Sequence, residues 1–218
     1  MVLRYIARLI APPSCVVCGS EGRVVCRQCA DGLVMPQRSL CFWCGTSSTN
    51  GQTCNLCQSV IALKGLVVAS AYTGAARELI GLLKYHRQRD AAAALAATLT
   101  PLLDPTSFDA VTSVPVATSR LRQRGYNQSE LIAKAVARSL ALPYRPLLRR
   151  IRNTQQVGKS RRQRLEQVSG VFVARGAPPP RVLIIDDVLT TGATLNSCAV
   201  SLKQAGAAEI WGAVAARD

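Results

Sequence analysis

The sequence is poor in acidic residues, in histidine and in long apolar runs. Its 218 residues include 12 Asp and Glu against 27 Lys and Arg, and a single histidine. No apolar run reaches the ~18 residues that a membrane-spanning helix needs, which excludes a transmembrane segment. The lone His86 is too isolated for a histidine metal site or a catalytic dyad, and we expect it at the surface. Because 49% of the residues are hydrophobic, the chain can still bury a core, and general disorder is excluded.

The first residues of the sequence do not have the pattern expected of a secretory leader. The apolar residues of MVLRYIARLIAPPSC are interrupted by Arg4 and Arg8 and stop at Pro12 and Pro13. This pattern predicts a short amphipathic helix and not a signal peptide, so we expect a cytoplasmic protein.

Cysteine, in contrast, is plentiful in the first sixty residues. A C-x-x-C turn aims two thiolates at one point, and two such turns complete the tetrahedral shell of four sulfurs that Zn²⁺ prefers. A disulfide-stapled secreted module is the alternative, and the missing signal peptide argues against it. We therefore expect two closed, structural zinc sites. The eight ligands, in four C-x-x-C pairs, are Cys15, Cys18, Cys26, Cys29, Cys41, Cys44, Cys54 and Cys57.

The spacing leaves open which pairs share a metal. Sequential pairing closes hairpins across 21–25 and 46–53, whereas a crossed arrangement joins the first pair to the third and the second to the fourth. We favour the sequential arrangement. In both cases the segment is too short and polar to fold by burial alone, so metal binding worth about 10–16 kcal/mol per site would supply its folding energy. Phe42 and Trp43 are expected to pack the small core of this ribbon.

Beyond residue 62 the pattern changes to alternating strands and helices. We expect a zinc-ribbon module with a short N-terminal helix over 1–62 and an α/β domain over 63–218. Alternation of this kind implies a mainly parallel sheet flanked by helices. The expected strands are 65–71, 108–116, 182–185 and 209–215, and the expected helices are 74–86, 91–103, 127–140 and 192–205. Asn127 with Glu130 resembles a capping box.

The most informative segment is VLIIDDVLTTGAT at 182–194. An apolar strand ends in Asp186 and Asp187, and small hydroxyl-bearing residues then open a helix. Free backbone amides and the positive helix end form an anion cradle, and Gly192 lets the backbone approach a ligand closely. Two carboxylates would repel a phosphate, so we expect them to contact hydroxyls or a divalent cation instead. A ligand that carries both hydroxyls and a phosphate is a sugar phosphate. A Walker A lysine and a G-x-G-x-x-G motif are both absent.

This segment resembles the signature of type I phosphoribosyltransferases. The resemblance implies that Asp186 and Asp187 are the catalytic pair and hold the ribose hydroxyls of phosphoribosyl pyrophosphate (PRPP), which binds with Mg²⁺. It also implies that the following loop binds the 5′-phosphate through Thr190, Thr191, Gly192, Ala193 and Thr194.

Over nearly its whole length the sequence is similar to the ComF/GntX family. These are phosphoribosyltransferase-like proteins with an N-terminal zinc ribbon, some of them tied to natural DNA uptake. The wider match is carried by LLKY at 82–85, SVPV at 113–116 and RQRGYNQ at 122–128.

The family resemblance also implies two further loops. The turn after SVPV corresponds to the pyrophosphate loop, in which we assign Pro115, Val116, Arg120 and Arg124 to PRPP. The segment RNTQQVGKSRRQR corresponds to the mobile loop that closes over PRPP, in which we assign Arg152, Thr154, Gln156, Arg162 and Arg164. Two positions depart from the family pattern, which has Leu at position 159 and Asn at position 167, where this chain has Lys159 and Gln167.

The positive charge is concentrated in the same region. Residues 120–164 contain thirteen Lys and Arg against one acid, Glu130, so they carry +12 of the net +15. This segment fits a pyrophosphate clamp, a strip that follows a nucleic-acid backbone, or a solvated basic face. Only Tyr126 and Tyr144 lie among the cations, so base stacking has little support.

Two functions remain open. The leading one is a PRPP-dependent phosphoribosyltransferase with an unidentified acceptor and a role linked to DNA uptake. The alternative is a non-catalytic accessory protein that binds single-stranded DNA and a DNA-uptake helicase, with a regulatory or vestigial PRPP site. Lys84 is either an active-site residue or an exposed helix lysine, and Cys198 is expected to be buried. The sequence predicts neither the acceptor nor the oligomeric state.

Overall fold

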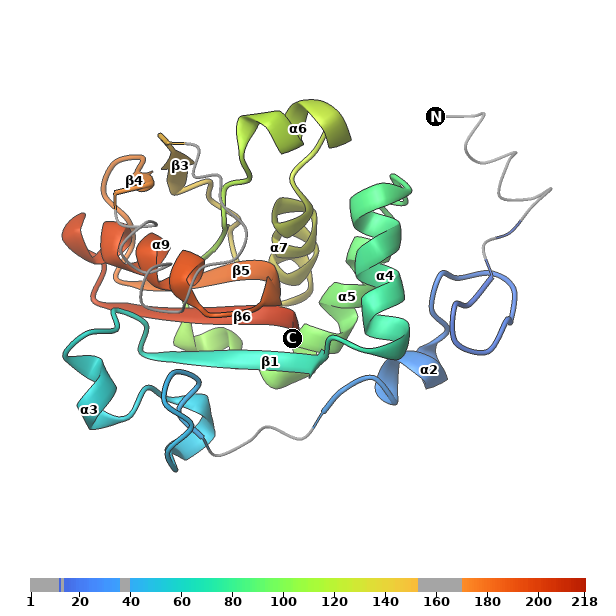
Figure 1. The fold of residues 1–218 in the computed structure, drawn as a ribbon, viewed down its shortest axis with the longest axis horizontal. Coiled ribbons are helices and arrows are strands. Elements are labelled where there is room, and N and C mark those ends of the chain that lie inside the picture. The colour runs from blue at the N-terminus through green and yellow to red at the C-terminus, as the bar shows by residue number, and fades with distance from the viewer. Residues whose placement is uncertain (1–11, 13, 36–39, 153–169) are drawn as a thin grey trace.

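A computed structural model describes Pro12 and residues 14–35, 40–152 and 170–218 of the chain. The centre of the described structure is a four-stranded parallel sheet with the order β1-β6-β5-β2 (Figure 1). The strands are β1 (Gly65–Ala71), β2 (Ala110–Ser113), β5 (Arg181–Leu189) and β6 (Glu209–Arg217). The predicted parallel sheet is thus confirmed, while β2, β5 and β6 differ from the expected bounds at their ends.

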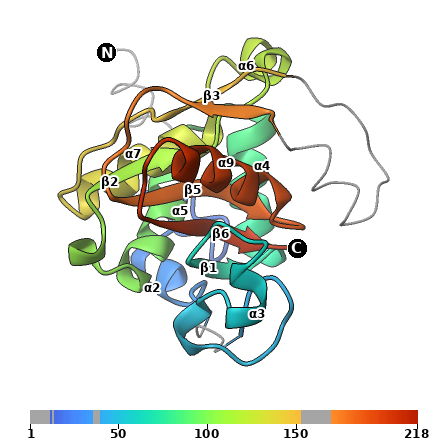
Figure 2. The ribbon, with the colours of Figure 1, turned by 90° about the vertical axis from the view of Figure 1, so that its left-hand side faces the viewer.

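Helices cover both faces of this sheet (Figures 1 and 2). One face carries α4 (Gly74–Tyr85), α5 (Ala91–Leu99) and α7 (Gln128–Ser139), which pack around Leu183 and Ile185 of β5. The other face carries α9 (Ala193–Gln204), which packs around Val182 and Ile184. Cys198 lies in α9 and is fully buried, as expected. Alternate residues of β5 therefore belong to two separate cores, as a central strand requires.

Several short elements were not expected from the sequence. The helix α6 (Thr118–Arg124) follows β2, and a small antiparallel sheet joins β3 (Leu148–Arg150) to β4 (Phe172–Ala174). The helix that was predicted over 91–103 instead ends at Leu99. Pro101 falls in the turn after it, η2 (Thr100–Leu102), and a further turn, η3 (Pro105–Ser107), precedes β2.

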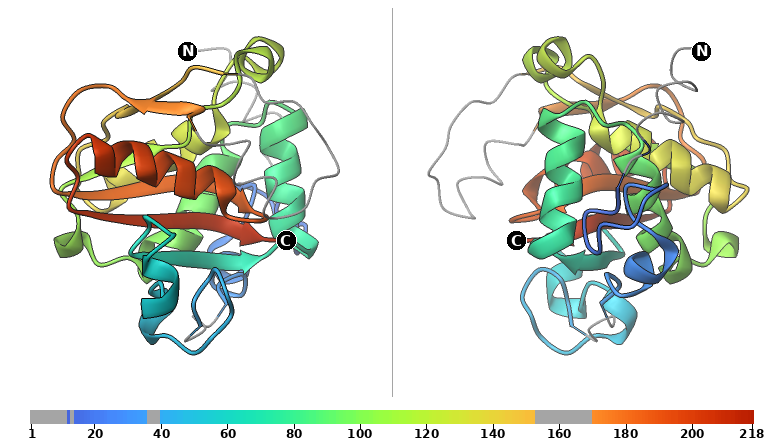
Figure 3. Two further views of the ribbon diagram at one scale, coloured as in Figure 1. Left: turned by 60° about the vertical axis from the view of Figure 1, so that its left-hand side comes forward. Right: turned by 90° about the vertical axis from the view of Figure 1, so that its right-hand side faces the viewer.

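The cysteine-rich segment forms two separate modules. The first zinc module (residues 14–31) contains α2 (Arg27–Asp31), which contacts α5. The second zinc module (residues 40–58) contains η1 (Thr49–Gly51) and α3 (Asn55–Gln58), and a bridge from Gln52 to Gly65 joins it to β1. Figure 3 shows the two modules against different parts of the α/β domain. None of the described helices has both the length and the apolar character needed to cross a bilayer.

Candidate functional site

The eight N-terminal cysteines form two clusters of four thiols. Cys15, Cys18, Cys26 and Cys29 make one, and Cys41, Cys44, Cys54 and Cys57 make the other, so the pairing is sequential. Within each cluster the ligand atoms all lie within 4.8 Å of one another. The Cys18 and Cys26 sulfurs are 3.7 Å apart, and the Cys44 and Cys54 sulfurs are 3.5 Å apart. With zinc–sulfur bonds of ~2.3 Å, a tetrahedral site has sulfurs about 3.8 Å apart, so both clusters fit structural zinc.

Hydrogen bonds prepare individual thiols for a metal. The Cys26 amide lies 3.4 Å from the Cys15 sulfur, and such bonds lower the pKa of Cys15 to about 6. The Thr46 hydroxyl, 3.2 Å from the Cys44 sulfur, helps to lower the pKa of Cys44 to about 6. The thiolate is the form that binds a metal. A hydrogen bond with Cys26 raises the pKa of Cys29 to about 12, so complete ionisation of the cluster needs a cation.

A cavity of about 980 Å³ opens where the parallel strands end. Parallel sheets usually bind ligands at this edge. Most of the residues predicted to contact PRPP line this one cavity, namely Pro115, Val116, Arg120, Arg124, Asp186, Asp187, Thr190 and Thr194. The wall also contains residues that the prediction left out, namely Tyr72, Val114, Ala117, Ser119, Asn127, Gln128, Ser129, Arg150, Val188 and Asp218.

The two acids lie inside β5 and not after its end, which corrects the predicted strand boundary. β6 pairs with β5 as far as Leu189, whereas β2 stops where Ser113 meets Ile185. Among the described strands, Asp186 and Asp187 therefore have a neighbour on one side only, and the side beyond β2 is open to the cavity. Each carboxylate also accepts the amide of the next residue, at 2.9 and 2.8 Å, which fixes its direction.

Asp186 is held by the start of α7. The Ser129 hydroxyl donates to its carboxylate at 2.7 Å, and Asn127 caps the helix and donates to the carbonyl of Val114 at 2.9 Å. Burial, followed by the charge of Asp187, raises the pKa of Asp186 to about 7. The Asn127 side chain accepts the Ser129 amide at 3.2 Å. Of the expected capping box only this half is seen among the described residues.

Asp187 is paired with Lys84 of α4. The ammonium lies 2.7 Å from Asp187 Oδ2, and the two side chains are 18% and 15% exposed. Of the two readings of Lys84, the structure therefore supports the one at the site. Sequence reasoning did not decide this because Lys84 and Asp187 lie far apart in the sequence and meet only in the folded protein. Exposed His86, two residues further on, is at the surface as expected.

The predicted phosphate loop faces two ways. Thr190 and Thr194 line the cavity, and between them the Ala193 amide donates to Thr191 Oγ1 at 3.5 Å. Gly192 has a φ of +79° and faces the second zinc module, where a methyl group on it would lie 3.2 Å from the Phe42 ring.

Phe42 belongs to a larger core than we predicted. Its side chain is only 4% exposed, and it packs with residues of β5 and α9 as well as with its own module. Phe42 thus packs against the side of the 190–194 loop on which Gly192 lies.

Three arginines and the Gln128 amide also line the cavity. Arg150 of β3 joins Arg120 and Arg124, and burial lowers its pKa. Gln128 Nε2 is buried and has no hydrogen-bond partner among the described residues. A buried donor normally has a partner, so a ligand oxygen would satisfy this one.

The predicted mobile loop is described only at its start. Arg152 is exposed, and its carbonyl accepts a hydrogen bond from Arg150 Nε at 3.0 Å. The other assigned residues, Thr154, Gln156, Arg162 and Arg164, lie outside the described residues.

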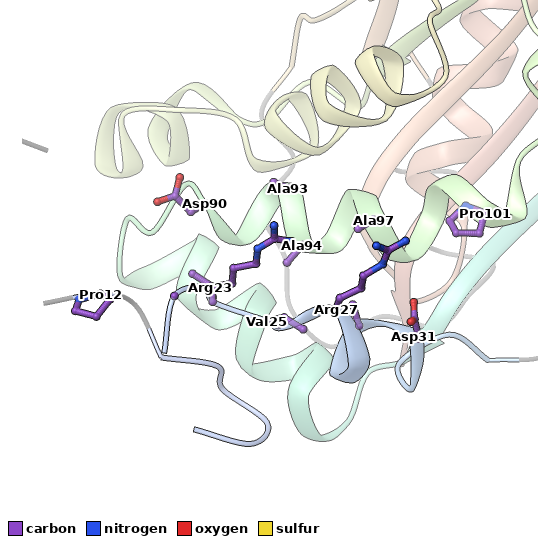
Figure 4. A pocket seen from close by; sticks show the side chains of 13 residues that line it. Pro12, Arg23, Val25, Arg27, Asp31, Asp90, Ala93, Ala94, Ala97 and Pro101 are labelled. Atoms are coloured by element: carbon purple, nitrogen blue, oxygen red, sulfur yellow. The ribbon is translucent and has the colours of Figure 1, made fainter. Parts of the chain in front are cut away.

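A second cavity, of about 760 Å³, lies between the first zinc module and α5. Arg23 and Arg27 reach from the module toward the alanines of α5, with Asp31 and Asp90 at the borders (Figure 4). Among the described residues of its wall, two arginines and two carboxylates balance, and this balance indicates no particular ligand.

Two family models match parts of this chain. Residues 6–58 match a family model described as a double zinc ribbon domain, and residues 127–218 match one described as a phosphoribosyl transferase domain. The DNA utilization protein YhgH of Salmonella typhimurium is 32% identical over 204 residues, which cover 86% of this chain and 88% of that protein. The chain belongs to the ComF family.

Two ComF-family relatives match over a shorter part. Competence protein F of Haemophilus influenzae is 37% identical over 112 residues, 48% of this chain and 49% of that protein. Competence protein ComFC of Streptococcus pneumoniae is 33% identical over 98 residues, 44% of this chain and 43% of that protein. The chain is thus matched to about half the length of each. As a ComF-family member it joins two zinc sites of four cysteines each to a phosphoribosyltransferase-like α/β domain.

Proposed function

We propose that this ComF-family protein binds PRPP with Mg²⁺ in the cavity at the end of the sheet and transfers the phosphoribosyl group to a nitrogen acceptor. One observation carries the proposal. The acid pair, the turn after β2 and two threonines of the loop after β5 face a single cavity. A sugar carrying a phosphate at one end and a pyrophosphate at the other needs these three kinds of partner.

The residues divide by chemistry. Asp186 and Asp187 supply acceptors for the ribose hydroxyls, and the Thr190–Thr194 loop supplies amides and hydroxyls for the 5′-phosphate. Arg120 and Arg124, beside the turn after β2, supply charge for the pyrophosphate. The Gln128 amide, which has no partner within the described parts of the chain, adds a donor for a ligand oxygen.

The same residues fit Mg²⁺, because carboxylate oxygens are hard ligands and PRPP adds phosphate oxygens. When bound, Mg²⁺ would neutralise charge on the pyrophosphate. The arginines then stabilise the negative charge that grows on the pyrophosphate oxygen as its bond to the ribose C1 breaks. The acceptor nitrogen forms the new bond to C1, pyrophosphate leaves with the electron pair of the broken bond, and the proton of the nitrogen passes to solvent.

Calorimetry with PRPP and Mg²⁺ tests the site. Asp187→Ala should bind PRPP at least about tenfold more weakly than wild type, which corresponds to about 1.4 kcal/mol. Asp104→Ala is the matched control, because Asp104 is an exposed carboxylate that caps a turn before β2. Equal affinity in wild type and Asp187→Ala would refute the hydroxyl role. A pyrophosphate-release screen with amine and base acceptors tests transfer.

A second function is favoured by exposed charge near the cavity. Arg120 and Arg122 are exposed on α6, and the relatives carry names that refer to DNA utilization and competence. In this function the protein is an accessory factor for single-stranded DNA and a DNA-uptake helicase. A salt titration of single-stranded DNA affinity tests it, and a flat log–log slope would exclude phosphate contacts.

Both functions are proposed for the cytoplasm. Thiols stay reduced there, as eight zinc-ligating cysteines require.

A further inference from the structure

The ion pair between Lys84 and Asp187 lies inside the cavity proposed for PRPP. Both side chains line its wall, and both keep some exposure, 18% and 15%. Asp186 instead receives the hydroxyl of Ser129. Of the two acids, Asp187 is therefore the one with a direct ammonium partner among the described residues.

The backbone around Lys84 is anchored, while its side chain is long. Leu83 is fully buried, and its carbonyl accepts a hydrogen bond from the Tyr126 hydroxyl at 2.5 Å. On the other side, the Arg124 guanidinium lies 5.7 Å from the centre of the Tyr85 ring. The ammonium can therefore move on its four-carbon stem without movement of α4. A lysine ammonium is a compact charge with rotatable donors, so it can exchange one oxygen partner for another.

We propose that Lys84 is an exchangeable counter-ion. It neutralises Asp187 in the ligand-free protein and moves to the pyrophosphate oxygens when PRPP and a divalent cation occupy the carboxylate. This inference rests on the proposed function. It also predicts how the two ligands depend on each other. A divalent cation that binds alone must displace Lys84 from Asp187 and leaves the ammonium without an anion. When PRPP is also bound, its pyrophosphate oxygens become the new partner of Lys84. The cation and PRPP therefore strengthen each other's binding, and the effect is reciprocal.

The charges around the pair favour an exchange of partners by Lys84 rather than a permanent salt bridge with Asp187. Arg120, Arg124 and Arg150 line the same cavity, so the pyrophosphate side is already positive. The acid side has two adjacent carboxylates, and burial together with Asp187 raises the pKa of Asp186. When Lys84 leaves Asp187 for the phosphates, a divalent cation can take its place, so Asp187 keeps a positive partner and the phosphates gain one.

The test uses zinc-loaded protein and two separate titrations. Mn²⁺ alone is titrated by electron paramagnetic resonance, and PRPP is titrated by calorimetry in saturating Mg²⁺. In Lys84→Met we expect Mn²⁺ alone to bind at least about tenfold more tightly, and PRPP at least about tenfold more weakly, each change being about 1.4 kcal/mol. A lysine that only supports the fold would weaken both.

Two variants control the measurement. Lys84→Arg keeps the charge beside Asp187, so its affinity for Mn²⁺ alone should match wild type. Lys134→Met removes the ammonium of another close pair, 2.6 Å from Glu130 on α7, and should change neither titration. Unchanged or weaker Mn²⁺ binding in Lys84→Met overturns the inference, as does unchanged PRPP binding. If wild type itself fails to bind PRPP, the proposed function fails, and the Mn²⁺ titration still decides whether Lys84 masks Asp187.

Discussion

The two zinc modules have the same four-thiol ligand set but different neighbours. The first packs Val24 and Val25 into the core beneath α4, α5 and α7. The second packs Phe42 against Gly192 of the predicted phosphate loop, and just beyond it the amide of Ala62 donates to Asn196 Oδ1 of α9 at 2.8 Å.

This difference shows that ligand chemistry identifies a metal site without assigning it a role. Both clusters close four thiolates around one point and leave no position for a substrate. Within the described parts of the chain, it is the second module that packs against the phosphate loop of the candidate site. We therefore expect its metal to influence PRPP binding, while the metal of the first module supports the fold.

The largest effect should come from removing one zinc at a time. Cys54→Ser and Cys26→Ser each break one cluster, and each should lose one of two zinc ions and on the order of 5 kcal/mol of unfolding free energy. Cys54→Ser should also weaken PRPP binding at least about tenfold, because Phe42 no longer supports the loop. Cys26→Ser should stay within about twofold of wild type.

Metal analysis, chemical denaturation and calorimetry on the same preparations measure these quantities. If both variants lost PRPP affinity equally, the distinction between the modules would be wrong.

A smaller effect should follow from two glycines with the same backbone angle. Gly192 and Gly125 both have φ of +79°, but of the two only Gly192 has a close neighbour in the described structure, the Phe42 ring. Alanine at either position is strained by about 1 kcal/mol. Gly192→Ala should cost about 1–3 kcal/mol more, because the added methyl overpacks against Phe42. Chemical denaturation of both variants gives this difference, and equal losses would mean that Phe42 yields without cost.

Residues that act together within a short stretch could be predicted from the sequence. The C-x-x-C pairs and the Asp186–Thr194 segment carry their chemistry in adjacent positions, so their residue types alone predict zinc sites and a sugar-phosphate site. The central strands and helices were also predicted, because their apolar patterns are long enough to show a period.

Residues that meet only after folding could not be predicted in the same way. Ser129 and Asp186 are 57 positions apart, and their hydrogen bond depends on α7 beginning beside β5. The contact between Phe42 and Gly192 depends likewise on the packing of the second module. β3 and β4 contain three residues each, too few for an alternating pattern to be recognised. What the sequence missed is therefore mainly the support around the acids and the loop.

The smallest effect we expect is a pH dependence of the unfolding free energy that arises from Asp186 of the acid pair and not from the zinc modules. Burial raises the pKa of Asp186 to about 7, against about 3.9 for an unfolded aspartate. Between these values the folded protein holds a proton that the unfolded chain lacks. This contribution to stability is complete below about pH 4 and is lost as the pH rises through about 7.

Asp186→Asn removes this titration while keeping an oxygen for the Ser129 hydroxyl. Between pH 6 and 8 wild type should therefore lose about 1 kcal/mol of unfolding free energy more than Asp186→Asn. Zinc stays bound to its thiolates in both proteins, so the difference between them excludes the cysteines. The same difference should persist in a Cys26→Ser background, because none of the described residues of the first module lines the cavity that contains Asp186. If the unfolding free energies of wild type and Asp186→Asn changed equally with pH, Asp186 would already be ionised at pH 6. Burial of its carboxylate would then not raise its pKa to about 7.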